Sequence, residues 1–208
     1  MSKSLAAQSC ADFTEALSSP APTPGGGAAA ALTGALAAAL CEMAGNLSRG
    51  KKRAMGHEEE LDRLCKQAQA LRLRFLALMD EDAAAFEPLR RAYALPKGEP
   101  ETARELTEAS LGACRPPMAM LRCCGEAVEL LEALQPLCSP LLLSDLGCAA
   151  ATARAALEAA SLNVLVNTRG LSGCADAKAL EREADALLAA FVPRAQALVQ
   201  SVNNALRR

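Results

Sequence analysis

Apolar side chains recur along the middle of this chain at the spacing of an α-helix. One stripe starts at Leu61 and another at Leu106, and in both the apolar positions fall every three or four residues over many turns. The second stripe crosses Pro116-Pro117, which predicts either two helical segments or one kinked helix. The stripes comprise Leu61, Leu64, Ala68, Leu71, Phe75, Met79, Phe86 and Leu89, and then Leu106, Ala109, Ala113, Leu121, Cys124, Val128 and Leu131.

Proline and glycine clusters divide the rest of the chain into further helices. A loop over residues 18–27 contains three prolines and three glycines, and the segment that follows it is rich in alanine. Small side chains let neighbouring backbones approach closely, so we expect this Ala-rich helix at the centre. We predict an all-α fold, a single domain over residues 1–208 with about six helices in a bundle. The other predicted helices are a short one before residue 18, one from Ser144 as N-cap to about Asn167, and one from Asp176 to Leu206.

The composition agrees with a helical core and disfavours several functions. Of the 208 residues, 51% are hydrophobic but only 2% are aromatic, and alanine is the commonest residue, which disfavours a β-sandwich or barrel. The formal net charge is −2 without a long basic block, which disfavours nucleic acid or a membrane surface as the main partner. Residues 28–47 have the length of a membrane span, but Glu42 interrupts them and alanine is weakly apolar, so we favour a buried helix.

The nine cysteines do not indicate a disulfide or metal protein. Their number is odd, no pair is spaced Cys-x-x-Cys, and His57 is the only histidine, so the ligand spacing of a zinc site is missing. We interpret the cysteines as small hydrophobic residues and expect no metal. The N-terminal sequence lacks the features of a secretory signal, and we expect a cytoplasmic protein. His57 is interpreted as a helix-start residue rather than a phosphotransfer histidine.

Asp82 breaks the first apolar stripe. Each residue advances about 100° around a helix, so Asp82 falls in the middle of the stripe, between Met79 and Phe86. Asp80 and Glu81 fall well outside it. A carboxylate on an apolar face is costly to bury unless it is paired, hydrogen-bonded or neutral, and such groups are frequent in catalysis. Two interpretations stay open: a catalytic carboxylate, or one that pairs with an arginine or caps a neighbouring helix.

Polar residues also share one side of the helix predicted from Ser144. Asp145 lies near its start, and Asn163 and Asn167 lie near its end, with small residues between them. Such a face can line a groove for a flat ligand. The asparagines can equally form hydrogen bonds between helices in a tightly packed core.

Two further segments are candidates for ligand binding. Gly25, Gly26 and Gly27 fit the dinucleotide pattern only formally, because no strand precedes them. They lead into a helix N-terminus, where free backbone N–H groups favour an anionic or electron-rich ligand atom, unless the loop merely turns the chain. Lys51 and Lys52 could hold a carboxylated ligand, although a charged turn is more often simply solvated.

Six ordered blocks of the sequence together resemble the cyclodeaminase/cyclohydrolase family of folate enzymes. The resemblance extends from about Phe13 to Phe191. It implies an all-α bundle around a central helix, usually dimeric, and it places the family's catalytic aspartate on Asp82. The blocks are SPAPTPGGGAAAA from Ser19, Asn46–Lys52, Met79–Phe86, Leu95–Lys97, Ser144–Gly147 and Asn163–Asn167.

The resemblance also implies roles for the other candidates. Asp145, Asn163 and Asn167 would hydrogen-bond the pterin edge, and Lys51 or Lys52 the glutamate tail of the folate. No cofactor is expected beyond the tetrahydrofolate substrate. Two departures from the family pattern are the absence of a serine after the glycine triplet, where Ala28 stands, and of an aromatic residue at Ala54. The first puts one ligand hydrogen bond in doubt.

The expected reaction is that of formimidoyltetrahydrofolate cyclodeaminase, which converts 5-formimidoyltetrahydrofolate to 5,10-methenyltetrahydrofolate and ammonia. The alternative is methenyltetrahydrofolate cyclohydrolase, which opens the 5,10-methenyl compound to 10-formyltetrahydrofolate. A third hypothesis is a non-catalytic helical scaffold that binds partners through Ala-rich faces. A homodimer is expected, and a cyclodeaminase would need a formimidoyltransferase on a separate polypeptide.

Overall fold

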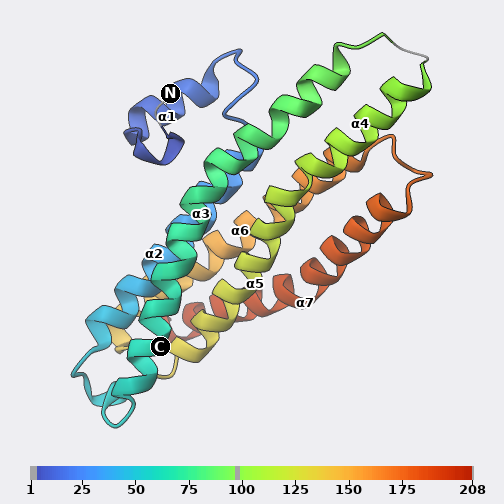
Figure 1. The fold of residues 1–208 in the computed structure, drawn as a ribbon. Helices are drawn as coiled ribbons and strands as arrows, with labels where there is room; N and C mark the ends of the chain where they lie inside the picture. Colours follow the sequence, from blue (N-terminus) through green and yellow to red (C-terminus); the bar gives the residue numbers. More distant parts are fainter. Residues whose placement is uncertain (1–3, 97–98, 208) are drawn as a thin grey trace.

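The long helices of the protein run roughly along one common direction (Figure 1). The computed structural model describes residues 4–96 and 99–207, in which no strand occurs. Six helices have 14 residues or more, and the nine-residue α1 precedes them. The prediction of an all-α bundle is confirmed. The helices are α1 (Cys10–Ser18), α2 (Gly26–Ser48), α3 (Glu58–Tyr93), α4 (Pro100–Ala113), α5 (Arg115–Leu134), α6 (Leu143–Thr168) and α7 (Ala175–Leu206), with 3-10 turns η1 (Leu5–Ala7), η2 (Lys52–Ala54) and η3 (Pro140–Leu142).

The Ala-rich α2 is buried in the bundle along one side, and its other side carries the exposed Leu36, Met43 and Leu47. It packs against α3, α6 and α5, and its small side chains permit close approach. A Cβ at Gly34 would overlap the ring of Phe75 on α3, which is fully buried. By length and composition alone α2 would qualify as a membrane span, but 56% of its apolar window is buried inside the protein. The long predicted stripe on α3 is buried as expected, except that Phe86 is only half-buried.

The structure decides three local predictions, which concern Pro116-Pro117, Ser144 and Cys148. The stripe that crosses Pro116-Pro117 forms two helices, because both prolines lie in the first turn of α5, where a missing N–H costs nothing. Ser144 is not an N-cap, since α6 begins at Leu143 directly after η3. Cys148 is exposed rather than a core residue. Lys97, in the loop before α4, lies outside the described residues.

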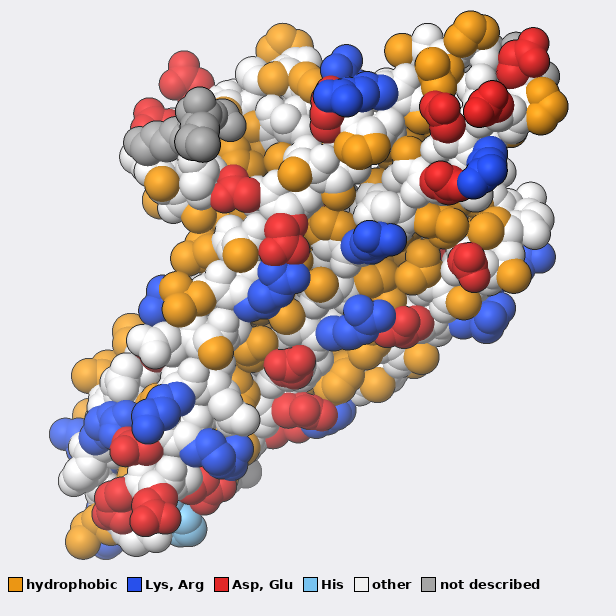
Figure 2. Space-filling model, in the orientation of Figure 1, with side chains coloured by type: hydrophobic (Ala, Val, Ile, Leu, Met, Phe, Trp, Pro, Cys, Tyr) orange, Lys and Arg blue, Asp and Glu red, His pale blue; other side chains and the backbone are white. Residues whose placement is uncertain are grey.

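The surface differs between the two sides of the bundle. Figure 2 shows the side formed by α3, α4 and α5, on which acidic and basic side chains alternate with apolar ones. On α2 and its neighbour α6, in contrast, large apolar side chains point outward. The apolar face of α2 and α6 comprises Leu36, Met43 and Leu47 on α2 and Leu162, Leu165 and Val166 on α6.

Candidate active site

Asp82 of α3 lies against the first turn of α2. Gly26 and Gly27 are the first two residues of that helix, and Gly25 is its N-cap. A Cβ at Gly27 would overlap the Asp82 carboxyl group, so only glycine lets the two helices approach so closely here. The glycine triplet therefore does more than turn the chain: it makes room for a carboxylate beside a helix N-terminus, where the N–H groups of the first turn have no partner within the helix.

The surroundings of Asp82 favour its protonated form. Burial raises the pKa of the Asp82 carboxyl from 3.8 to about 6, while the backbone amide of Ala28 acts in the opposite direction. Among the described residues no charged side chain contributes to this shift. The alternative of an arginine partner thus finds no support in the described part of the chain. Helix capping is partly realised, since the carboxyl faces the N-terminus of α2.

Asn163 of α6 lies on the other side of the glycine turn. Its Oδ1 is 3.4 Å from the position that a Cβ of Gly26 would occupy, and its Nδ2 donates a hydrogen bond to the carbonyl of Ala159 at 2.8 Å. Asn167, one turn further along, instead donates to the carbonyl of Ala113 at 2.9 Å and joins α6 to the end of α4. Asn163 is thus the asparagine adjacent to the glycine turn, while Asn167 connects two helices.

The remaining predicted site residues lie at the opposite end of the bundle. Lys51 lies three residues after the end of α2 at Ser48. At 1.5 Å of rise per residue, that end is about 33 Å from Gly26. Lys52 belongs to η2, and Asp145 lies in the first turn of α6. Helices α2 and α6 are antiparallel, so these three residues share one end of the bundle. Within one chain the structure therefore does not bring these three residues together with Asp82 and the glycine turn.

Comparisons with known proteins agree on one family. The sequence model described as formiminotransferase-cyclodeaminase matches residues 9–186, most of the chain. The chain belongs to this family. It is 38% identical over 181 residues to methenyltetrahydrofolate cyclohydrolase of Methylorubrum extorquens, covering 85% of this chain and 87% of the relative. It is 33% identical over 174 residues to formimidoyltransferase-cyclodeaminase of Rattus norvegicus, covering 82% of this chain but only 32% of that protein.

A solved structure of the formiminotransferase-cyclodeaminase family has the same fold. The crystal structure of formiminotetrahydrofolate cyclodeaminase from Thermotoga maritima superimposes with a TM-score of 0.83 at 29% identity, over 94% of this chain and 98% of that one. The relatives carry the names of enzymes, and this chain is an enzyme of the same kind. The resemblance seen in the six sequence blocks is thereby confirmed.

Asp80 has contacts that the sequence did not indicate. It points away from Asp82, as the helical spacing predicts, and its carboxylate accepts hydrogen bonds from Ser4 and Leu5 of the N-terminal segment. No signal in the sequence links residues some 75 positions apart. Of the two aspartates in the D-x-D pattern, Asp80 thus binds the N-terminal segment and Asp82 contacts the first turn of α2.

A groove of about 750 Å³ lies between α3, α4 and α5. It is lined by Glu81, Ala85, Arg91, Glu108 and Arg115, among others, and none of the predicted site residues is among the lining residues. Because it lacks both Asp82 and the glycine turn, we place the candidate site at the junction of α2, α3 and α6 instead. Among the described residues, no group of histidine, cysteine and carboxylate side chains is arranged to hold a metal ion.

Proposed function

We propose that this protein is a methenyltetrahydrofolate cyclohydrolase, which hydrolyses 5,10-methenyltetrahydrofolate to 10-formyltetrahydrofolate. The observation that carries the proposal is its similarity, over nearly the whole length of both chains, to the enzyme of that name from Methylorubrum extorquens. The cyclodeaminase reaction, which the sequence led us to expect, becomes the second candidate. The relative named cyclohydrolase is 38% identical to this chain, whereas the solved structure named cyclodeaminase is 29% identical.

The geometry of Asp82 suits this chemistry. With a pKa of about 6, the carboxyl is mainly ionised at pH 7 and yet basic enough to accept a proton. In the proposed reaction the Asp82 carboxylate takes a proton from a water molecule as its oxygen attacks the cationic methenyl carbon. The same proton then passes to the ring nitrogen that leaves when the five-membered ring opens, while the hydroxyl proton of the tetrahedral intermediate is released to solvent as the formyl C=O bond forms. The cationic substrate and one water molecule thus give the neutral formyl product and one proton.

The glycine turn and Asn163 provide the complementary polar contacts. The N–H groups of the first turn of α2 are directed to the same space as the Asp82 carboxyl and suit a carbonyl or anionic atom of the ligand. Asn163 retains its Oδ1 as a free acceptor, since only its Nδ2 is bonded to Ala159, and a pterin edge offers N–H donors. We assign Asn163 to the pterin and leave Asn167 in its contact with α4.

A spectrophotometric comparison of the two possible substrates tests the proposal. The purified protein is offered 5,10-methenyltetrahydrofolate in one assay and 5-formimidoyltetrahydrofolate in another, with the Asp82→Asn variant as control. We expect rapid loss of the methenyl absorbance in the first assay, dependence on Asp82, and no release of ammonia in the second. Faster ammonia release than methenyl hydrolysis would overturn the assignment.

The cyclodeaminase reaction is the second candidate, favoured by the fold match to the protein from Thermotoga maritima named for it. Here Asp82 would take the proton from the attacking folate nitrogen and deliver it to the departing ammonia. The substrate would then come from a formimidoyltransferase on another polypeptide. The assay above separates the two reactions.

The protein acts as a homodimer through the apolar face of α2 and α6. Six large apolar side chains are exposed there on two neighbouring antiparallel helices. In a dimer with its two-fold axis across this face, each copy covers these side chains of the other. Such an axis, perpendicular to α2, sets the end with Lys51, Lys52 and Asp145 of one copy beside the Asp82 end of the other. The two lysines would then hold the glutamate tail across the interface. Light scattering at micromolar concentration tests this, and a strictly monomeric protein would exclude it.

A further inference from the structure

The N-terminal segment, residues 4–24, is held on α3 by the carboxylate of Asp80. Oδ2 accepts a hydrogen bond from the Ser4 hydroxyl at 2.5 Å, and Oδ1 accepts one from the backbone N–H of Leu5 at 2.8 Å. Leu5 begins η1, so its N–H has no partner within that turn. Both carboxylate oxygens of Asp80 therefore contact the start of the segment.

Few other contacts hold this segment. Its buried residues are Phe13 of α1 and Pro24, directly before the glycine turn, and Leu5 and Leu17 are partly buried against the core. The rest of α1 is exposed or half-buried, and in Figure 1 the helix lies beside the bundle rather than within it. The position of the segment therefore depends on a small number of anchors, of which Asp80 is the one next to its start.

The other end of the segment is the glycine turn of the candidate site. Residue 24 is followed by Gly25, the N-cap of α2, and then by Gly27, which contacts Asp82. Asp80 and Asp82 are two residues apart and point to nearly opposite sides of α3. One turn of α3 thus contacts the start of the segment through Asp80 and, through Asp82, the first turn of α2 that follows the segment.

We propose that Asp80 is a positioning residue: by holding Ser4 and Leu5 it keeps residues 4–24 packed beside α3 and thereby keeps the glycine turn in its ligand-binding position. Asp80 touches neither the ligand nor the reacting atoms. The proposal rests on the proposed function only in that the ligand is a reduced folate.

Loss of the Asp80 anchor should weaken substrate binding without changing the chemical step. If the anchor is lost, the segment spends part of its time away from α3, and the apparent affinity falls by the fraction of molecules that keep the competent arrangement. Asp82 itself stays half-buried between α2 and α3. KM should therefore rise while kcat and its dependence on pH stay unchanged.

The test uses Asp80→Asn, whose amide nitrogen cannot accept the second hydrogen bond, and Ser4→Ala, which removes one donor and leaves α3 intact. The matched control is Glu81→Gln, the adjacent exposed carboxylate, which pairs with Arg74. Hydrogen–deuterium exchange is measured over residues 4–24, together with steady-state kinetics on both folates. We expect faster exchange confined to residues 4–24 in both variants, and KM raised about three- to tenfold in Asp80→Asn and less in Ser4→Ala. Glu81→Gln should behave as wild type.

Three results would overturn the proposal: unchanged exchange over residues 4–24, a fall in kcat with KM unchanged, or faster exchange spread evenly over the bundle. The last would give Asp80 only a general structural role. If the wild-type protein turned over neither folate, the proposed function would fail. The exchange experiment would still decide whether Asp80 anchors the segment.

Discussion

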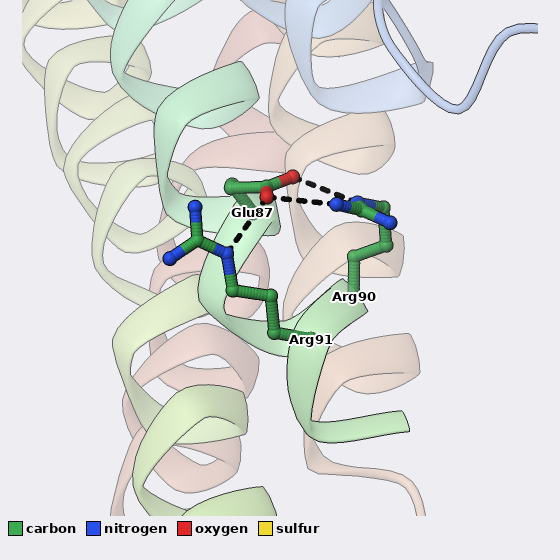
Figure 3. Close-up of polar contacts among 3 residues, drawn as sticks. All are labelled: Glu87, Arg90 and Arg91. Carbon is green, nitrogen blue, oxygen red and sulfur yellow. Dashed lines mark hydrogen bonds and ion pairs between the residues drawn. The ribbon is translucent and has the colours of Figure 1, made fainter. Parts of the chain in front are cut away.

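Two acidic residues only five positions apart on α3 have opposite properties. Glu87 keeps 40% of its side chain exposed and accepts hydrogen bonds from Arg90, at 2.8 Å, and from Arg91, at 2.9 Å (Figure 3). These two arginines lower the pKa of its carboxyl to about 2. Asp82 has no charged partner among the described residues, and burial raises its pKa to about 6. One helix thus carries a carboxylate that is always ionised and another that exchanges a proton near neutrality.

The comparison of Glu87 with Asp82 shows that the surroundings of a carboxylate, and not the residue type, set its pKa and make it suitable for catalysis. The Glu87 cluster is a surface ion pair network, and such pairs contribute little to stability because water competes with them. The ionised form of Asp82 is disfavoured because its carboxyl group is partly desolvated against α2. A protein keeps such an unfavourable group where function depends on it.

Asp82→Asn should have the largest effect on activity. The substitution keeps the size of the side chain but removes the group that accepts and returns the proton. We expect kcat to fall by about 10² to 10⁴, the usual contribution of a positioned general acid–base, while folate binding persists. Turnover and a thermal shift with folate measure the two quantities. Normal turnover in the variant would move the catalytic role away from α3.

Gly27→Ala should come next. The added Cβ would overlap the Asp82 carboxyl, so the side chain or the first turn of α2 must move. Because displacement of a catalytic group by about 1 Å can cost up to about 10²-fold, we expect activity to fall at least about tenfold. Gly112→Ala, in α4 where a Cβ meets nothing within 4 Å, is the control and should retain activity. Equal losses in both variants would show that the close approach at Gly27 is irrelevant.

The pH dependence of kcat/KM should show the raised pKa directly. Since the ionised form of Asp82 is the base, activity should fall below pH 6, by about tenfold per pH unit. A substitution that exposes Asp82, such as Gly27→Ala, should move the pH at which this fall in kcat/KM begins toward lower values. A limb near pH 4 in the wild type would mean that Asp82 is not desolvated.

The sequence predicted the local part of this site but not its assembly. Helical spacing was enough to select Asp82 over Asp80, because burial on one face of a helix follows from periodicity. It could not show that Lys51 and Asp145 lie at the far end of the bundle from Asp82, since the direction in which helices pack is not a local property. The hydrogen bonds from Ser4 to Asp80 likewise depend on tertiary contacts over some 75 residues, for which a single sequence carries no signal.

Asp82→Asn should also change stability, with the sign opposite to its effect on activity. The folded-state pKa of Asp82 is raised from 3.8 to about 6, so its contribution is most favourable below about pH 4 and is lost as the pH rises through 6. At pH 7 the buried charge therefore destabilises the wild type, and the asparagine variant should be more stable by about 1 to 3 kcal/mol. Urea unfolding at pH 7 and pH 4 measures this, and the difference should shrink at pH 4. A variant that is less stable at pH 7 would contradict the burial of a charge.

Glu87→Gln should have the smallest effect on both stability and turnover. Its lowered pKa contributes stability that is present above the unfolded-state pKa and is lost only as the pH falls toward about 2. Because the pair is exposed to solvent, removing the charge at pH 7 should shift the midpoint of thermal unfolding by less than about 2 °C and leave turnover unchanged. Calorimetry and the methenyl assay measure both quantities. A loss of turnover close to that of Asp82→Asn would show that negative charge along α3, rather than the burial of one carboxyl group, supports the reaction.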